Sequence, residues 1–517
     1  MIIQSEEGFI KNRYVVLKEF RTAYIDRAEK NSEVTLRYIM PPEGDSSTEE
    51  MQRDFSSVGA DNVNTLANKY MLTLFPPNKS FFKLQPNITT QTIEHIGITD
   101  SEMDTMLTQA EREARWQLEK KHGRPALIDA IKHLIVTGNA LIYYPEDGNI
   151  QMYALDQYVV HRSMDGTVTE IITEDEKSLG SLDKELREEV MSVMEFESDI
   201  DIHKTNVILY TYIHIDEENP LNLIVEQAVE HAPIKEPFTI ERNKNRWIPL
   251  VWQQTRREQY GRGLVEDHYG SLWAISVLSE AIVTGAAVMS DIKYLVRPGS
   301  VLDVVELNKA KSGTYHIGEP DDVQAIGTDK AKDLQFIQSL IEKYERLLGK
   351  AFLSMSSQMR DAERVTAEEN RMRAQELEQA HGGVFSSLSM ELQYPLANLL
   401  LDEFNISLTD SGIDLVVVSG LDAMGRVSDN EKLLQLFNDL TLLNNIPESL
   451  LPVFKFIDTV KMLANGRDVD VNKIIKSAQE IEQEQQAQAQ AQQGQMATEE
   501  MMKKASAEQL AEGMQDA

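Results

Sequence analysis

Cysteine is absent from this chain of 517 residues. Its absence excludes disulfides, thiolate metal sites and cysteine nucleophiles, and it is typical of proteins that assemble in a reducing cytoplasm. Basic residues are also few: 51 lysines and arginines stand against 84 aspartates and glutamates, which gives a net charge of −33. A surface this acidic repels nucleic acid over most of its area. The charge therefore argues against tight DNA binding over the whole surface, and it leaves a local basic contact open.

Long apolar runs are missing as well. The nearest candidate for a membrane span, residues 281–289, is flanked by Glu280 and Asp291. It falls short of the roughly 18 apolar residues that a span needs. The first seven residues have neither the basic region nor the apolar stretch of a signal peptide. The sequence therefore predicts a soluble protein with no membrane partner.

The motifs of familiar enzymes are also lacking. There is no GxxxxGK[ST] phosphate loop, no HExxH zinc motif, no GxSxG nucleophile elbow and no GxGxxG dinucleotide loop. Residues 468–472 have oxygen side chains at calcium-loop spacing, but Lys473 replaces the turn glycine and Gln479 replaces the bidentate glutamate. The sequence therefore predicts no catalytic residues, no metal site, no cofactor and no enzymatic activity.

What is present, first, is a series of amphipathic helices, recognised by apolar residues at three- and four-residue steps. In residues 9–37 this stripe consists of Tyr14, Leu17, Phe20, Tyr24 and Ala28. In residues 61–73 and just beyond, it consists of Val63, Leu66, Ala67, Tyr70 and Leu74. Two more helices are predicted over residues 101–121 and 125–136.

A strand-rich region follows. Its short β-rich runs are residues 140–144, 150–153, 158–161, 168–173, 207–215 and 223–229. Asp147-Gly148-Asn149 and Asp165-Gly166 between them are turn signals of hairpins. The predicted fold class is α+β, mainly α-helical.

Two longer helices then flank an insertion. Residues 263–293 and 329–354 each carry an apolar stripe. Residues 300–328 between them contain three glycines and short β-type runs such as Val304-Val305 and Tyr315-His316-Ile317. This order predicts an antiparallel helix hairpin with a small β-containing insertion at its tip, each arm roughly 40 Å long.

The run Arg360-Asp-Ala-Glu-Arg-Val-Thr-Ala-Glu-Glu369 comes after the second long helix and opens a third. Thr366 can cap the new helix and Glu369 can complete a capping box. That helix is predicted over residues 367–401, with a kink at Gly382-Gly383 and an interruption at Pro395. Because arginines alternate with acids, the run is either a salt-bridged, solvated helix start or a contact for a polyanion.

The last part of the chain is predicted to contain a strand at residues 415–418 and helices at 427–443 and 447–464. Residues 483–495 are glutamine and alanine with almost no large apolar side chains. Such a stretch is a solvated helix or a disordered tail.

Several of these stretches occur in one order over residues 55–400. They are Ser57-Val-Gly-Ala60, Leu72-Thr-Leu-Phe-Pro-Pro-Asn78, Tyr158-Val-Val-His-Arg162, Gly261-Arg-Gly263, the run 360–369, Gly382-Gly-Val384 and Glu391-Leu-Gln393. Together they resemble the portal proteins, the head-to-tail connectors of short-tailed podovirus bacteriophages.

The resemblance implies a portal fold that assembles as a dodecameric ring around a central channel. Its parts would be a wing (1–260), a first stem helix (261–293), a clip (294–328), a second stem helix (329–355), a tunnel loop (356–366), a kinked helix returning to the wing (367–425), a helical crown (426–480) and a flexible Gln/Ala-rich tail (481–517).

The resemblance also implies a function and partners. The ring would stand at the portal vertex of the virion capsid, pass the genome during packaging and ejection, and bind the packaging motor and then the tail. Its partners would be other copies of the chain, the major capsid protein, scaffolding protein, the terminase large subunit, a tail adaptor protein, internal core or ejection proteins, and double-stranded DNA held non-specifically. Assembly would take place in the host cytoplasm.

Two sets of contact residues follow from this plan. The channel contacts to DNA would be Arg360, Arg364, Gln358 and Arg371. The clip residues that face the motor or adaptor would be Asp303, Glu306, Lys309, Lys311, Glu319 and Asp321. Two other functions stay open: another ring-forming tail adaptor or connector, and a packaging enzyme, which would need a nucleotide or metal site.

Overall fold

The computed structural model describes residues 6–42, 54–77, 80–86, 100–193, 201–290, 293–317, 319, 321–326, 331–354, 367–404 and 413–417. The chain forms two compact units, Met1–Asn87 with Ala110–Met424, and Ile88–Gln109 with Gly425–Ala517. The elements described below belong to the first unit, apart from the first half of α4 (Asp100–Lys120). Helices and antiparallel sheets are both present, as the predicted α+β class requires.

A five-stranded antiparallel sheet organises the first unit. Its strands follow one another in sequence order: β4 (Tyr158–Arg162), β5 (Val168–Ser178), β6 (Asn206–Ile215), β7 (Asn222–Val229) and β8 (Ala232–Glu241). The sequence predicts the first four of these strands but misses β8. Pro233, Pro237 and the charged pair Lys235-Glu236 break its apolar alternation, which an edge strand tolerates. Helix α6 (Lys184–Val193) packs against β8.

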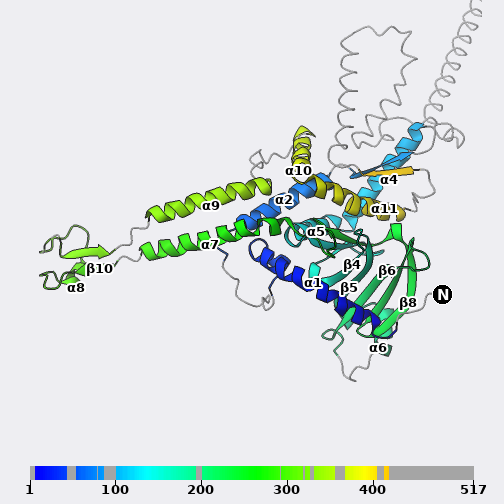
Figure 1. Ribbon diagram of the computed structural model, residues 1–517, viewed down its shortest axis with the longest axis horizontal. Helices are drawn as coiled ribbons and strands as arrows, with labels where there is room; N and C mark the ends of the chain where they lie inside the picture. Colours follow the sequence, from blue (N-terminus) through cyan, green and yellow to red (C-terminus); the bar gives the residue numbers. More distant parts are fainter. Residues whose placement is uncertain are drawn as a thin grey trace, which may run out of the picture. The chain divides into compact units, whose positions relative to one another are not determined.

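Helix α1 (Phe9–Glu33) packs across one face of this sheet (Figure 1). Its buried side chains Ile10, Tyr14 and Leu17 join a core cluster with Val159, Ile172, Tyr210, Tyr212 and Ala228. The prediction that Phe20 lies on the buried face is wrong, because Phe20 is 59% exposed and Arg21 is 3% exposed. Arg21 takes this place because its Nη1 donates a hydrogen bond to the Tyr158 carbonyl at 2.6 Å.

The free edge of β4 is closed by side chains rather than by another strand. Besides Arg21, the Tyr260 hydroxyl accepts from the Val160 amide at 3.2 Å, and the Gln259 side chain accepts from the Arg162 amide. Unpaired strand edges otherwise invite pairing with other chains. The contacts also fix residues 259–260, which lead into the first long helix, to the sheet.

A second layer is built from helices and a smaller sheet. It contains α2 (Val58–Leu74), α5 (Gly123–Thr137) and the three-stranded sheet β3 (Gln151–Tyr153), β2 (Asn139–Tyr143) and β9 (Trp247–Val251). The predicted stripe of α2, namely Val63, Leu66, Ala67, Tyr70 and Leu74, is confirmed, since all five residues are fully buried. The strand predicted near residue 415 is also confirmed: β12 (Ile413–Val417) pairs with β1 (Phe82–Pro86).

His133 lies on α5 inside this layer and is 7% exposed. Burial lowers its pKa from the usual 6.5 to about 4. As the pH falls from 6.5 to 4, the unfolded chain therefore binds a proton on His133 that the folded chain does not bind. The stability present above pH 6.5 is lost over that window, by about 3 kcal/mol at 1.36 kcal/mol per pKa unit.

We expect His133→Leu to flatten the fall in urea-unfolding free energy between pH 6.5 and 4. The exposed His316→Leu is the matched control and should keep the parental slope. An unchanged acid slope in His133→Leu would show that this histidine does not set the pH dependence.

A broken helical segment precedes strand β12 in the chain. It consists of α10 (Ala367–Leu388), the π-helical turn η6 (Ser389–Gln393) and α11 (Tyr394–Asp402). The backbone leaves helical geometry at His381 (φ −134°, ψ 34°), beside the glycine pair where the kink is predicted. Pro395 lies in the first turn of α11, where proline is tolerated. The helices predicted at 427–443 and 447–464 and the Gln/Ala tail lie outside the described residues.

Candidate functional site: a helix hairpin with an uncovered apolar face

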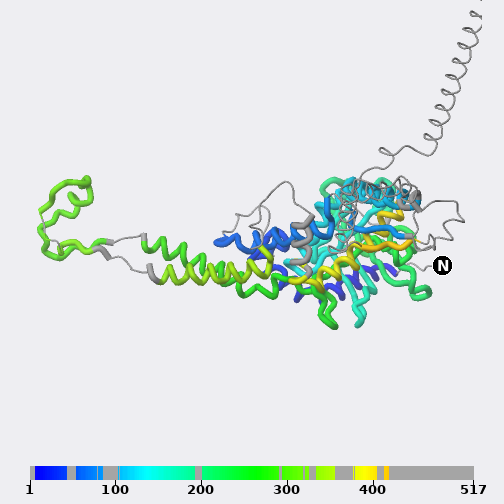
Figure 2. Tube along the Cα trace, turned by 90° about the horizontal axis from the view of Figure 1, so that it is seen from above, coloured from blue at the N-terminus to red at the C-terminus, as the bar shows by residue number. Residues whose placement is uncertain are grey.

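The two long helices form the predicted antiparallel hairpin. Helix α7 (Leu264–Ser290) and helix α9 (Ala331–Ala351) run side by side in both views (Figures 1 and 2). At one end the rings of His268 and Phe352 lie 5.8 Å apart. Near the other end a Cβ on Gly285 would lie 3.1 Å from Leu334 Cδ2. These two pairs fix the register of the hairpin.

One face of α7 is covered in part as the sequence predicts. Ile275 is buried and Leu278, Ile282 and Met289 are half-buried, whereas Ala286 of the same predicted stripe is exposed. No described residue of α7 beyond Ile275 is fully buried. The outer half of α7 is therefore covered mainly by α9.

The opposite face of α7 is apolar and uncovered. Trp273, Val277, Val283 and Val288 are 53%, 40%, 55% and 53% exposed. Glu280 is the one charged residue between positions 269 and 290. The expectation that no apolar stretch is long enough for a membrane span is wrong. By length and composition α7 could cross a membrane, and 11% of its most apolar window is buried.

Helix α9 has a more ordinary distribution of side chains. Its outward residues are mostly polar or charged: Gln335, Gln338, Glu342, Lys343, Glu345, Arg346 and Lys350. Phe336 and Leu347 are the exceptions, at 64% and 51% exposed. An exposed apolar surface shared by two adjacent helices marks an interaction site.

The root of α7 is held against the end of α5 by close backbone packing. The Asn139 side chain accepts from the Gly261 amide at 2.7 Å and donates to the Gly261 carbonyl at 2.9 Å. A Cβ on Gly138 would lie 2.4 Å from the backbone carbon of Arg262. The stretch Gly261-Arg-Gly263, one of the portal-like blocks, is thus the point where the hairpin joins the body.

The end of α9 is fixed by a buried lysine. Lys69 of α2 is 8% exposed, and its Nζ donates to the Leu353 carbonyl at 2.5 Å. A cation is favourable at the carbonyl end of a helix. On the other side, the Gln393 amide donates to the Leu74 carbonyl at the end of α2 at 2.5 Å. Helix α2 is therefore tied to the end of α9 and to η6.

The kink of α10 lies where three helices meet. The His381 ring stacks on Tyr70 at 6.2 Å and meets Trp252 edge-on at 5.8 Å. Burial lowers the pKa of His381, which keeps the ring neutral near pH 7. A cavity of about 660 Å³ opens beside it, lined by His268 of α7 and Lys350 of α9 among others.

The insertion between the helices is a small module. Strand β10 (Lys293–Val296) pairs with β11 (Val323–Ile326), and helix α8 (Val304–Lys309) lies between them in sequence. The β-type interpretation of Val304-Val305 is wrong, because Asp303 accepts from the amides of Val305 and Glu306 and so starts a helix. Residues 315–317 form no strand either.

The module has almost no core in a single chain. Asp322 is its one buried residue among those described. Seven of its large apolar side chains are more than half exposed: Tyr294, Leu295, Val301, Val304, Val305, Tyr315 and Ile317. An isolated two-stranded ribbon is marginally stable at best. Contact with other chains would supply the missing core.

The predicted contact residues fall into two groups. Those of the clip are described and exposed: Asp303, Glu306, Lys309, Lys311, Glu319 and Asp321. Asp303 already uses its carboxylate as the cap of α8. Arg360, Arg364, Gln358 and Thr366 lie outside the described residues, as do the side chains of Arg371 and Glu369 in α10. Their roles remain predictions.

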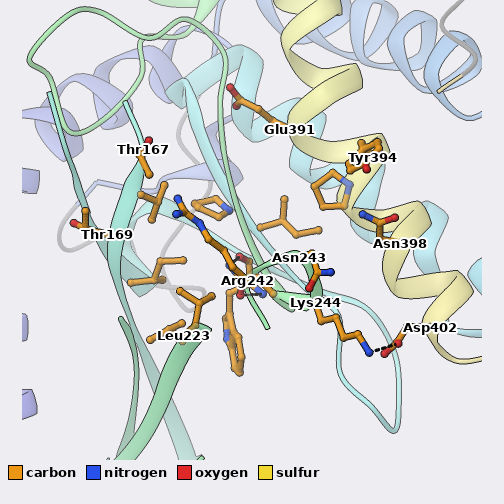
Figure 3. A pocket seen from close by; sticks show the side chains of 18 of the residues that line it. Thr167, Thr169, Leu223, Arg242, Asn243, Lys244, Glu391, Tyr394, Asn398 and Asp402 are labelled. Atoms are coloured by element: carbon orange, nitrogen blue, oxygen red, sulfur yellow. Dashed lines mark hydrogen bonds and ion pairs between the residues drawn. The ribbon is translucent and has the colours of Figure 1, made fainter. Parts of the chain in front are cut away.

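A separate cleft of about 760 Å³ lies between the large sheet and α11 (Figure 3). Lys244 Nζ pairs there with Asp402 Oδ1 at 2.7 Å, and the Asn245 side chain satisfies the amide and carbonyl of Trp247 on the free edge of β9. Among the described residues no cluster of three or more His, Cys, Asp or Glu could hold a metal. The cleft is the boundary along which the five-stranded sheet and helix α11 face each other.

Fold and site together define an α+β chain with a long helix hairpin and an exposed apolar face on it. A profile of the bacteriophage head to tail connecting proteins matches residues 8–470. The portal protein of Enterobacteria phage SP6 is 34% identical over 484 residues, 93% of each chain. The portal protein of Escherichia phage T7 is 30% identical over 496 residues, 93% of this chain and 90% of its own. The chain therefore belongs to the family of bacteriophage head to tail connecting proteins.

The match extends beyond the blocks at residues 55–400, since it includes α1 and the segment up to residue 470. The protein is a structural connector of the phage head and tail, and its relatives are portal proteins. Among solved structures, a chain in the neck of a native gene transfer agent (GTA) particle covers 74% of this chain and 85% of its own. Its TM-score of 0.34 and identity of 9% are too low to indicate function.

Proposed function

We propose that the chain forms a dodecameric ring at one vertex of the capsid, which serves as the channel for genome packaging and ejection. The uncovered apolar face of α7 carries this proposal. A face of this kind is stable in water only when another molecule covers it. In a closed ring each copy offers one face to the next copy, so that no copy is left uncovered.

The clip, residues 294–328, binds the packaging motor and later the tail adaptor in this proposal. Its support is the exposed mixture of apolar and charged side chains on a module without its own core. The major capsid protein, scaffolding protein and internal core or ejection proteins would contact other parts of the ring, as the family membership suggests.

The tunnel loop, residues 356–366, is the proposed DNA contact. Arg360 and Arg364 would face phosphates, helped by Gln358 and by Arg371 in the first turns of α10. A ring multiplies each cation by the number of subunits, which yields a local positive collar inside a negative tube. Phosphate contacts of this kind hold DNA without reading its sequence.

The mass of the purified protein in solution tests the ring. We expect a particle near twelve times 58.6 kDa that hydrolyses no nucleotide. A monomer with nucleotide hydrolysis would favour the packaging enzyme instead. A tail adaptor would also form a ring, but it would not support packaging of DNA into proheads that contain this chain as their only connector.

A further inference from the structure

Resting on the proposed ring, we propose that the outward face of α7 packs against α9 of the neighbouring copy. In that contact Glu280 of one copy pairs with Lys343 of the next. The contact goes beyond the ring itself because it names the two faces, their register and the ion pair that selects it.

The face offered by α7 is a continuous stripe. It consists of residues spaced three or four apart, all exposed: Trp273, Val277, Glu280, Thr284 and Val288. This spacing places them on one side of the helix, one above the other. The stripe is apolar except for the carboxylate of Glu280 and the hydroxyl of Thr284.

The face offered by α9 has the complementary charge. Phe336, Lys343 and Leu347 lie on one flank of that helix, with the half-buried Leu340 between them. This stripe is apolar except for one ammonium group. Among the described residues neither Glu280 nor Lys343 has an ionic partner within 4 Å. One acid and one base thus stand unpaired in two apolar stripes.

The register of the hairpin brings these residues to matching heights. Starting from the level pair His268 and Phe352, Val277 and Lys343 are each nine residues further along the hairpin. Glu280 is three residues beyond Val277, about 4.5 Å along the axis, which a lysine side chain spans. In the proposed contact the hairpins stand side by side with their long axes along the ring axis, so residues that are level within a copy are level between neighbours.

The second copy is favoured over another occupant by this self-complementarity. Both stripes belong to the same hairpin, both are exposed, and their single charges are opposite in sign. A membrane would leave Glu280 in the hydrocarbon region, which is costly. An unrelated partner would leave the stripe of α9 unexplained.

Disulfide trapping in the full-length protein tests the register, because the natural chain contains no cysteine. Val277→Cys combined with Lys343→Cys should, on oxidation, give a ladder of linked subunits on a non-reducing gel. The matched control is Val288→Cys with Lys343→Cys. Its positions differ in height by 11 residues, roughly 16 Å, which exceeds the reach of a disulfide.

A charge exchange tests the ion pair separately. Glu280→Lys or Lys343→Glu alone should lower the fraction of protein in rings roughly tenfold at equal concentration, which corresponds to about 1.4 kcal/mol. The double exchange should restore it. Glu342→Lys, an exposed change on the same helix but outside the stripe, is the control and should leave ring formation unchanged.

The outcomes separate the two proposals. Rings of the parental mass that give no ladder with the matched pair, or a ladder only with the mismatched pair, would overturn the α7–α9 contact and leave the ring standing. A parental protein that stays monomeric would overturn the proposed ring itself. Failure of the double exchange to restore rings would overturn the pairing of Glu280 with Lys343.

Discussion

Replacing Gly138 with alanine should destabilise the first unit by roughly 2 to 5 kcal/mol and displace the root of α7. Gly138 ends α5 with φ +81°, a left-handed conformation that costs an L-residue energy. The new Cβ would lie 2.4 Å from the backbone carbon of Arg262 and 2.5 Å from the amide nitrogen of Gly263. Backbone atoms cannot move aside as a flexible side chain can, so one of the two segments must shift.

Gly148→Ala is the matched control for this change. Gly148 also has a positive φ of +96°, but no atom lies within 4 Å of the position that its Cβ would occupy. Its substitution should therefore cost only the conformational strain, about 1 to 2 kcal/mol. Urea unfolding of both variants separates the strain from the close approach, and equal losses of stability would show that the contact between α5 and α7 carries no energy.

The same change has a consequence for assembly. The hairpin joins the body at Gly261 and Gly263, and Asn139 holds Gly261 through both of its backbone groups. A shifted root changes the direction in which α7 leaves the body. Gly138→Ala should therefore lower the yield of rings even at temperatures where the subunit stays folded, whereas Gly148→Ala should not.

The sequence predicts helices best where one apolar face meets one core. The stripe of α2 is correct in all five residues because α2 is buried along its length. In α1 the periodicity points to Phe20, yet the buried neighbour is Arg21. Periodicity reports hydrophobicity, whereas the position of Arg21 depends on the uncovered edge of a strand more than 130 residues away.

Two of the strands missed by the sequence have a common cause. β8 contains two prolines and β9 contains Pro249, and both lie at sheet edges, where proline removes a donor that has no strand to pair with. The clip shows the opposite error, because β-branched residues at 304–305 suggest a strand where the cap Asp303 starts a helix. Local capping chemistry decides the outcome there.

The candidate site is predictable from the sequence only in part. The helix hairpin follows from the two stripes, and the portal-like blocks follow from residue order. The apolar stripe of α7 predicts only the face that packs against α9. The further apolar residues at 273, 277, 283 and 288 do not fit on that face, and they are the sequence signal of a second, outward apolar face. Lys69 lies beside the apolar stripe of α2, and its burial against the Leu353 carbonyl does not follow from the periodicity.

Replacing Arg360 and Arg364 together with alanine should weaken the retention of packaged DNA while leaving the ring intact. The expectation rests on the proposed channel and on the resemblance of residues 360–369 to portal proteins. Lys69 holds Leu353, seven residues before Arg360, so that the chain can carry Arg360 at most about 25 Å from that point.

The size of the effect depends on the number of arginines in the ring, which is the number per chain multiplied by the number of subunits. Every subunit of the ring contributes both arginines, and removing one phosphate contact lowers the steepness of the salt dependence of DNA binding by about 0.9 in log–log slope. We expect filled heads of the double variant to release DNA more than tenfold faster than parental heads, with the difference shrinking as salt is raised. Arg256→Ala, an exposed arginine of the body, is the control and should behave as the parent.

The measurement is DNA protected from nuclease in purified heads, followed over time at two salt concentrations, with ring mass determined on the same preparations. Loss of rings would place the arginines in subunit contacts, where exposed ion pairs contribute about 0 to 1 kcal/mol each. Intact rings that retain DNA as the parent does at both salt concentrations would contradict the DNA contact. Arg360 and Arg364 would then belong to a salt-bridged, solvated helix start, the alternative that their alternation with acidic residues allows. Intact rings that release DNA, faster at low salt relative to the parent than at high salt, require that the arginines face phosphate in the channel.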